Sequence, residues 1–219
     1  MTSYEAIVFD MDGVLLTMTD PSVIDRAARE AFGAFGVEPT DEAIEPFTSA
    51  DADGLAAACE PFDLHPGTVW PAREWAASWL QAREMDAGRK RPYDEVREAV
   101  GSLDARVGLV SNNQHHTVGY ALDRFDLDGL FETAYGRGHT VEALRRRKPD
   151  PHYVDRALSD LGTRDALYVG DSGVDVEAAA RAGVDSAFVR RDHRADHRLR
   201  DDPDYEVADL AELVELLGS

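Results

Sequence analysis

The stretch AIVFDMDGVL, residues 6–15, joins a short apolar run directly to two aspartates and a glycine. Four consecutive apolar residues bounded by a turn signal are typical of a strand that is buried on both faces. An extended backbone directs alternate side chains the same way, so Asp10 and Asp12 are expected to point together just beyond this strand. Two carboxylates so close repel each other unless a divalent cation or a shared proton relieves them. The stretch therefore predicts a buried strand that ends in a charged functional site.

Apolar runs of the same kind recur later in the chain and alternate with helical patterns. Short apolar runs separated by helix-length segments indicate strands joined by helical crossovers in a parallel sheet. We therefore predict an α/β fold with a Rossmann-like parallel sheet as its core. The predicted strands span residues 6–9, 106–110, 133–135, 166–169 and 186–189, and the predicted helices of this part span residues 117–125, 151–161, 174–182 and 208–217.

A helical block interrupts the alternation between the first and second predicted strands. Residues 21–91 have helical spacing of apolar residues and no convincing strand. Trp70, Trp75 and Trp79 are spaced five and four residues apart, which fits one helix face in the core of this block. We predict an inserted α-helical cap domain at residues 17–91, carried by a core that consists of residues 1–16 and 92–219.

The composition excludes several classes of partner. The chain has 43 Asp and Glu against 23 Lys and Arg, a formal net charge of -20, which repels phosphate backbones, so no nucleic acid is expected as a partner. No apolar run approaches the roughly 20 residues of a membrane span, so no membrane is expected either. No cationic stretch precedes the first strand, and Cys59 is the single cysteine. We therefore expect no signal peptide and a cytoplasmic location.

The charged residues are also biased in kind. Of the 23 cations 21 are Arg, the only lysines are Lys90 and Lys148, and Asp exceeds Glu by 27 to 16. A surface rich in Asp and poor in Lys stays hydrated in strong salt, so we interpret the composition as that of an extreme halophile. The sequence carries no sign of its oligomeric state.

Polar residues follow three of the predicted strands, at the edge where open parallel sheets bind ligands. Carboxylate oxygens suit Mg²⁺, which prefers a few carboxylates together with water and substrate phosphate. A hydroxyl group and N–H groups at the start of a helix can hold an anion, and a lysine adds a point positive charge. The residues that follow the three strands are Asp10 and Asp12, Ser111 and Asn112, and Asp171 and Asp175. The lysine is Lys148, in the sequence KPDP.

In this order, the motifs resemble those of the haloacid dehalogenase superfamily, in the branch of phosphatases that carry a helical cap between the first two motifs. Phosphoglycolate phosphatases belong to that branch, and the resemblance extends over residues 6–217. The motifs are DMDGVL at residues 10–15, SN at residues 111–112, KPDP at residues 148–151 and GDSGVD at residues 170–175.

The resemblance implies a Mg²⁺-dependent phosphatase that acts on a small phosphorylated substrate through an aspartyl-phosphate. Asp10 would be the nucleophile, and Asp12 would act as general acid and then as general base. The residues that would bind Mg²⁺ are Asp10, Asp12 through its backbone carbonyl, Asp171, and Asp175 directly or through water. The residues that would bind phosphate are Gly13, Ser111, Asn112 and Lys148.

Two other functions stay open. One is a phosphomutase acting on a sugar phosphate, which would need cap residues that hold the far end of the substrate and exclude water. The other is a non-catalytic interaction module that keeps the fold, although the intact Asp10, Asp12, Lys148 and Asp171 argue against it.

Three side chains outside the motifs could carry chemistry. Lys90 would be the lysine required by a phosphonate-cleaving relative, but it lies in an Arg-rich turn at the end of the helical block. His193 and His197 are four residues apart, as in a helical metal pair. Their surroundings, residues 190–202, are dense in charge, and we expect a solvated loop there.

Overall fold

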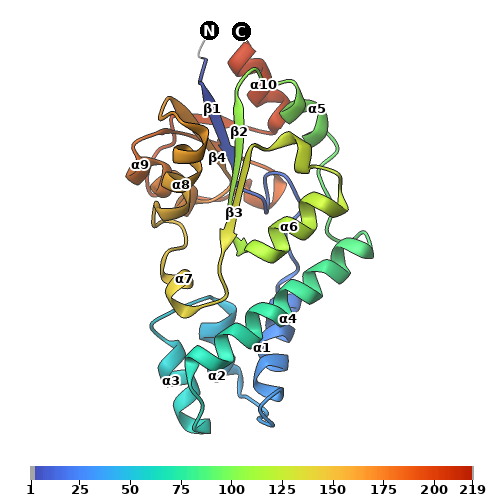
Figure 1. Ribbon diagram of the computed structural model, residues 1–219, viewed down its shortest axis with the longest axis vertical. Helices are drawn as coiled ribbons and strands as arrows, with labels where there is room; N and C mark the ends of the chain where they lie inside the picture. The colour runs from blue at the N-terminus through green and yellow to red at the C-terminus, as the bar shows by residue number, and fades with distance from the viewer. Residues whose placement is uncertain (1–2, 219) are drawn as a thin grey trace.

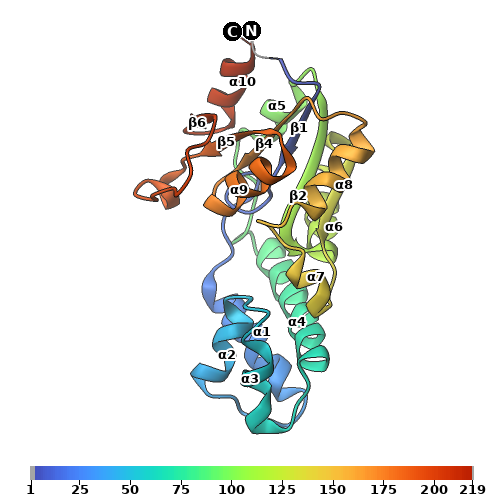
Figure 2. The same cartoon turned by 90° about the vertical axis from the view of Figure 1, so that its left-hand side faces the viewer.

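In the computed structural model, which describes residues 3–218, six parallel strands form one sheet in the order β3-β2-β1-β4-β5-β6 (strands labelled in Figures 1 and 2). This arrangement confirms the predicted α/β class. The strands are β1 (Ala6–Phe9), β2 (Arg106–Gln114), β3 (Thr133–Arg137), β4 (Ala166–Gly170), β5 (Asp185–Val189) and β6 (Tyr205–Val207).

Both faces of the sheet are covered by helices, which is why its central strands are almost wholly apolar (Figure 2). Ala6 and Val8 of β1 belong to the core shared with α8 (His152–Leu161) and α9 (Gly173–Ala182). Ile7 and Phe9 point to the opposite face, covered by α5 (Val96–Gly101), α6 (His115–Arg124) and α10 (Leu210–Gly218). Fully burying a side chain such as Phe9 stabilises the fold by roughly 1.5–3 kcal/mol.

The strand order reverses next to β1, and this reversal positions the site. The chain moves from β1 to β2 and β3 on one side, then returns to place β4 on the other side of β1. Phe9 lies beside Leu109 of β2 and beside Val169 of β4. The residues that follow these three positions therefore meet at the carboxyl edge, in the crevice where such sheets bind ligands.

The stretch from α1 to α4, residues 21–86, is helical, as predicted, and lies beyond the carboxyl edge of the sheet (Figures 1 and 2). Phe32, Phe47 and Trp70 form the centre of its own apolar cluster. The C-terminal end of α4 approaches the sheet, and Met85 in its last turn packs in the cluster that covers one sheet face. Its elements are α1 (Pro21–Gly33), α2 (Asp41–Thr48), α3 (Leu55–Cys59), η1 (Glu60–Phe62) and α4 (Pro66–Asp86).

The expectation of a common tryptophan face on α4 is wrong. Trp70 is fully buried, whereas Trp75 and Trp79 are 55% and 54% exposed. At 3.6 residues per turn, a spacing of five residues rotates a side chain by roughly 140°, which carries Trp75 to the other side of the helix. Trp75 instead lies against His139, with ring centroids 4.4 Å apart.

Other differences lie in short or polar segments. β2 continues to Gln114, four residues beyond the predicted end, and its pairing with β3 shifts between Val110 and Gln114. This polar extension is held by hydrogen bonds that include Arg137 Nε to the Asn112 carbonyl, 2.6 Å. The elements that the apolar pattern did not predict are α5, η2 (Asp128–Leu130), α7 (Val141–Arg145), η3 (Asp192–Arg194) and β6.

Close packing of β3 against the start of α6 yields a prediction. A Cβ added at Gly136 would lie 2.7 Å from both the backbone nitrogen and the Cα of His115. We expect Gly136→Ala to lower the free energy of unfolding by about 1–3 kcal/mol, because backbone atoms would have to move. Urea unfolding followed by circular dichroism measures the change.

Gly119→Ala is the matched control. Gly119 is exposed in α6, and an added Cβ would have nothing within 4 Å. This substitution should raise stability by about 0.5–1 kcal/mol, because alanine loses less backbone entropy in a helix than glycine. Equal unfolding midpoints for Gly136→Ala and the wild type would contradict the packing argument.

Candidate active site

Asp10 follows β1 at the carboxyl edge and faces the buried lysine Lys148. The Asp10 backbone N–H donates to the Val169 carbonyl at 2.8 Å, which continues the ladder between β1 and β4. Lys148 Nζ lies 2.9 Å from Asp10 Oδ1 and 2.6 Å from Asp175 Oδ1. The ammonium group also donates to the hydroxyl group of Tyr168 at 2.7 Å. Lys148 is therefore fixed beneath two carboxylates, and it is only 2% exposed.

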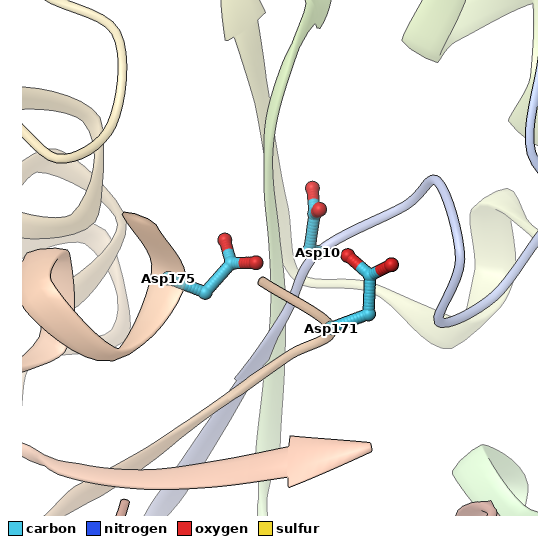
Figure 3. Close-up of side chains that lie close together, drawn as sticks. All are labelled: Asp10, Asp171 and Asp175. Atoms are coloured by element: carbon cyan, nitrogen blue, oxygen red, sulfur yellow. The ribbon is translucent and has the colours of Figure 1, made fainter. Parts of the chain in front are cut away.

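Asp171 and Asp175 complete an acidic cluster with Asp10 (Figure 3). One carboxylate oxygen from each of these three buried residues lies within 4.8 Å of the others. Asp171 directly follows β4, and Asp175 lies in the first turn of α9, where its Oδ2 accepts the Ser172 N–H at 3.0 Å. A Cβ at Gly170 would overlap the Asp175 side chain, so glycine is required for this close approach.

The cluster has more negative charge than Lys148 can balance. Burial raises the pKa of Asp10 to about 7, and Asp175 and Asp171 add to the shift while Lys148 opposes it. Burial alone would lower the pKa of Lys148, but the charges of Asp10 and Asp175 raise it well above its ordinary value.

The donor set fits a divalent cation. Asp10 Oδ1 and Asp175 Oδ1 are buried, and Lys148 Nζ lies 2.9 Å from the first oxygen and 2.6 Å from the second. Hard carboxylate oxygens grouped this closely are the ligands that divalent cations such as Mg²⁺ or Ca²⁺ take. Asp10, Asp171 and Asp175 are therefore the residues that could hold such an ion.

The segment after β5 is largely exposed, as expected for a solvated loop, but two of its residues also reach this cluster. His193 Nε2 lies 2.8 Å from Asp171 Oδ2, and Arg194 Nε donates to the same oxygen at 2.9 Å. His197 does not join them; its ring stacks on Phe188, with centroids 6.1 Å apart. The contacts of His193 and Arg194 were not predicted, because a run of charged residues resembles exposed surface in sequence.

Lys90, in the turn that follows α4, contacts Asp12. Lys90 is 1% exposed, and its Nζ donates to Asp12 Oδ1. Asn113 Nδ2 donates to the other carboxylate oxygen, Asp12 Oδ2, at 2.8 Å. The one sequence signal that could have marked Lys90 is its rarity, because the chain has only two lysines. Both of them are buried at the site.

Ser111 and Asn112 lie on the extension of β2, beside the cluster. Ser111 is buried, and its Oγ accepts the Asn113 N–H at 3.1 Å. Asn112 bonds to the backbone of Lys148 in both directions: its Nδ2 donates to the carbonyl at 3.1 Å, and its Oδ1 accepts the N–H at 2.7 Å. The side chain of Asn112 is thus engaged in holding the Lys148 segment.

One cavity of about 570 Å³ joins the predicted residues. Of the eight residues expected at the site, the one that does not line the cavity is Gly13. At Gly13 the backbone has a φ of +83°, and a Cβ would overlap the Asp171 carboxylate. Glycine therefore permits the close approach of these two segments. The predicted residues that line the cavity are Asp10, Asp12, Ser111, Asn112, Lys148, Asp171 and Asp175.

The wall of the cavity nearest the helical segment holds a second buried charge cluster, which the sequence did not reveal. Arg73 and Glu74 of α4 and Arg137 of β3 are at most 4% exposed. Arg73 Nη1 donates to Glu74 Oε1 at 2.6 Å, and Arg137 contacts both Glu74 oxygens. Two guanidinium groups thus share one carboxylate, which leaves an excess of positive charge at this wall.

Grouped carboxylates and a buried lysine at the reversal point of a parallel sheet form a candidate hydrolase site. The family model of haloacid dehalogenase-like hydrolases matches residues 7–189. The chain belongs to this family.

Curated relatives are similar over most of their length. The chain is 31% identical to the N-acetylmuramic acid 6-phosphate phosphatase of Pseudomonas aeruginosa, over 85% of this chain and 81% of that protein. It is 29% identical to a phosphoglycolate phosphatase of Cereibacter sphaeroides, over 86% of each chain.

Solved structures show the same fold. CbbY from Rhodobacter sphaeroides in complex with phosphate has a TM-score of 0.68 and 19% identity, over 96% of both chains. The hydrolase YfnB from Bacillus subtilis bound to magnesium has a TM-score of 0.62 and 17% identity, over 99% of this chain and 100% of that one. Within residues 3–218 no helix has the length and apolar character needed to cross a membrane.

The raised pKa of Asp10 predicts how metal-free stability depends on pH. The native pKa of about 7 exceeds the ordinary aspartate pKa of 3.8, so between these pH values the native state binds more protons than the unfolded state. Stability in EDTA should therefore fall as the pH rises from about 4 to 7. Asp10→Asn removes this loss and should be more stable than the wild type at pH 8, by on the order of 3 kcal/mol.

Denaturant unfolding at pH 5 and pH 8 measures this difference. Asp104→Asn, at an exposed aspartate outside the site, is the control and should match the wild type at both pH values. Wild type and Asp10→Asn with the same pH dependence would contradict the assignment of the unfavourable charge to Asp10.

Proposed function

We propose that the protein is a Mg²⁺-dependent phosphatase that removes phosphate from a small phosphorylated metabolite. The observation that carries this proposal is the buried Asp10 carboxylate, which lies beside Lys148 and the acidic cluster and shares one cavity with Asp12. The names of the curated relatives support the proposal, because they describe phosphatases of phosphorylated small molecules.

In the proposed reaction, an Asp10 carboxylate oxygen attacks phosphorus while the bond between phosphorus and the leaving oxygen breaks. Asp12 gives its proton to that oxygen, which departs as an alcohol. Asp12 then takes a proton from water as the water oxygen attacks the aspartyl-phosphate, which releases inorganic phosphate and restores Asp10. Lys148, Ser111 and neighbouring N–H groups would hold the phosphoryl oxygens.

Mg²⁺, when bound by Asp10, Asp171, Asp175 and the Asp12 carbonyl, would neutralise phosphoryl charge. We further propose that residues 17–91 act as a cap on a core of residues 1–16 and 92–219. The cap would close the cavity over the substrate and exclude water. Support comes from the mixed lining of the cavity, which combines Thr48 and Ser49 of the helical segment with the acidic cluster.

The proposal predicts phosphate release from at least one member of a panel of phosphomonoesters in Mg²⁺ and about 1 M KCl. The panel includes phosphoglycolate, N-acetylmuramic acid 6-phosphate, sugar phosphates and pyrophosphate. Asp10→Asn should lower the rate by at least roughly 10³-fold, because the nucleophile is lost, and EDTA should abolish turnover until Mg²⁺ is restored. A colorimetric phosphate assay measures release.

Two outcomes would contradict the proposal. Isomerisation of a sugar phosphate without phosphate release would identify a mutase. No release from any substrate, or equal turnover by wild type and Asp10→Asn, would remove the assignment of Asp10 as nucleophile.

The buried arginines favour a substrate with a second anionic group. Arg73 Nε donates to the Phe47 carbonyl at 2.9 Å and Nη1 donates to Glu74, and these two contacts use two of the five N–H donors of the guanidinium group. A guanidinium group that lines the cavity with free donors can bind a carboxylate or a second phosphate.

This preference can be measured with two esters of similar size. We expect wild type to have a higher kcat/KM for phosphoglycolate than for 2-hydroxyethyl phosphate, which lacks the carboxylate. Arg73→Gln should lower the ratio of these values by about 10–100-fold, because a charge-assisted hydrogen bond contributes roughly 1.5–3 kcal/mol. Arg83→Gln, at an exposed position of α4, is the control. A ratio unchanged in Arg73→Gln would contradict the preference.

We propose a cytoplasmic, salt-adapted protein. The excess of acidic residues and the replacement of lysine by arginine support salt adaptation, and the single buried cysteine supports a reducing compartment. The assays above therefore use molar KCl.

A further inference from the structure

We propose that Lys90 is a positioning residue for Asp12 and makes the orientation of this carboxylate depend on the placement of the cap. The inference rests on the proposed function, in which Asp12 moves the protons of the reaction. Nothing in the motifs of the family assigns a role to Lys90 in this chain.

The first support is the complete use of the Lys90 donors. An ammonium group has three N–H bonds, and Lys90 Nζ donates to three side-chain oxygens: Asp12 Oδ1, Thr19 Oγ1 at 2.6 Å and Gln81 Oε1 at 3.1 Å. Asp12 supplies the carboxylate in this set, so the charge of Lys90 is directed at Asp12. A compact ammonium group can meet three acceptors around one point, whereas the planar fork of arginine cannot.

The second support is where these acceptors come from. Thr19 precedes α1, Gln81 belongs to α4, and Lys90 lies where the chain leaves α4 for the sheet. The two connecting segments are bound to each other, since the Thr17 N–H donates to the Arg91 carbonyl at 2.9 Å. The position of Lys90 therefore depends on both segments that connect the helical segment to the sheet, the one before α1 and the one after α4.

The third support is a closed network with the sheet. Asn113 of β2 donates through Nδ2 to both Asp12 Oδ2 at 2.8 Å and Gln81 Oε1 at 2.7 Å. Gln81 Nε2 donates in return to Asn113 Oδ1 at 3.0 Å. Both carboxylate oxygens of Asp12 are therefore held by groups that also contact Gln81. A displacement of α4 from β2 separates Gln81 from Asn113 and loosens the network around Asp12.

The burial of Lys90 adds to the argument. A buried charge is destabilising unless its partners compensate it, so a lysine that is 1% exposed is expensive to keep for stability alone. Lys148, the other lysine, is buried against Asp10 and Asp175. Each lysine of the chain thus faces one of the two aspartates that would carry the chemistry.

A positioning role and a merely structural role differ in their dependence on the leaving group. Protonation by Asp12 assists an alkoxide strongly but hardly assists p-nitrophenolate, which leaves readily without a proton. Loss of Asp12 alignment should therefore slow the transfer of phosphate from an alkyl ester more than from p-nitrophenyl phosphate. A general loss of structure would slow both transfers equally.

The experiment measures kcat/KM for p-nitrophenyl phosphate and for the best alkyl phosphate of the panel, in wild type, Lys90→Met and Lys90→Arg. We expect Lys90→Met to lose about 10²-fold on the alkyl ester and less than 10-fold on the aryl ester. Lys90→Arg should restore only part of the loss, because its fork does not match the three acceptors. Asp12→Asn gives the reference for complete loss of proton transfer.

Controls separate this inference from the proposed function. Arg89→Met alters the neighbouring cation, which is exposed and pairs with Glu84, and should leave the ratio of the two substrates unchanged. Gln81→Leu removes the α4 side of the network and should change the ratio of kcat/KM for the two esters as Lys90→Met does. This variant keeps the inference testable if the lysine variants fail to fold. The inference would be overturned if the wild type is active and Lys90→Met loses kcat/KM equally on both esters. If the lysine variants do not fold, equal losses in Gln81→Leu would overturn it. An inactive wild type would overturn the proposed function.

Discussion

The contact on which the site depends is the ion pairing of Lys148 with Asp10 and Asp175. Two buried carboxylates come from different segments of the chain, and without a cation between them each would repel the other in a medium of low dielectric constant. Lys148 Nζ meets both within 3 Å. The surrounding residues serve this contact: the Tyr168 hydroxyl oxygen accepts a hydrogen bond from the ammonium group, and the Asn112 side chain holds the backbone of the lysine.

The position of this ion pair follows from the sheet. β1 lies between β2 and β4, so the residues after all three strands converge at one edge. The strands could be predicted from their apolar runs, and Asp10 and Asp171 from their positions directly after two of these runs. The convergence of the strand ends is why these aspartates could be expected to meet. The signal is local, because strand, turn and aspartate are consecutive in sequence.

The residues that the sequence did not reveal are held by contacts between distant segments. Lys90 and Asp12 are 78 residues apart, and Arg137 and Glu74 are 63 apart. Each appears in sequence as an ordinary charge, and its burial is decided only when helix and sheet pack. The error over Trp75 has a different cause: a spacing of five residues resembles helical periodicity but rotates too far to share a face.

The pairing of Glu74 with Arg137 has a consequence for the contact between the helical segment and the sheet. Glu74 belongs to α4, Arg137 belongs to β3, and the carboxylate is fully buried. Separating these elements replaces the contact by water, and dissolved ions stabilise the separated charges more than the pair. The packing of α4 on β3 is therefore the contact through which ionic strength would act on the interior of this protein, in addition to its effect on surface hydration.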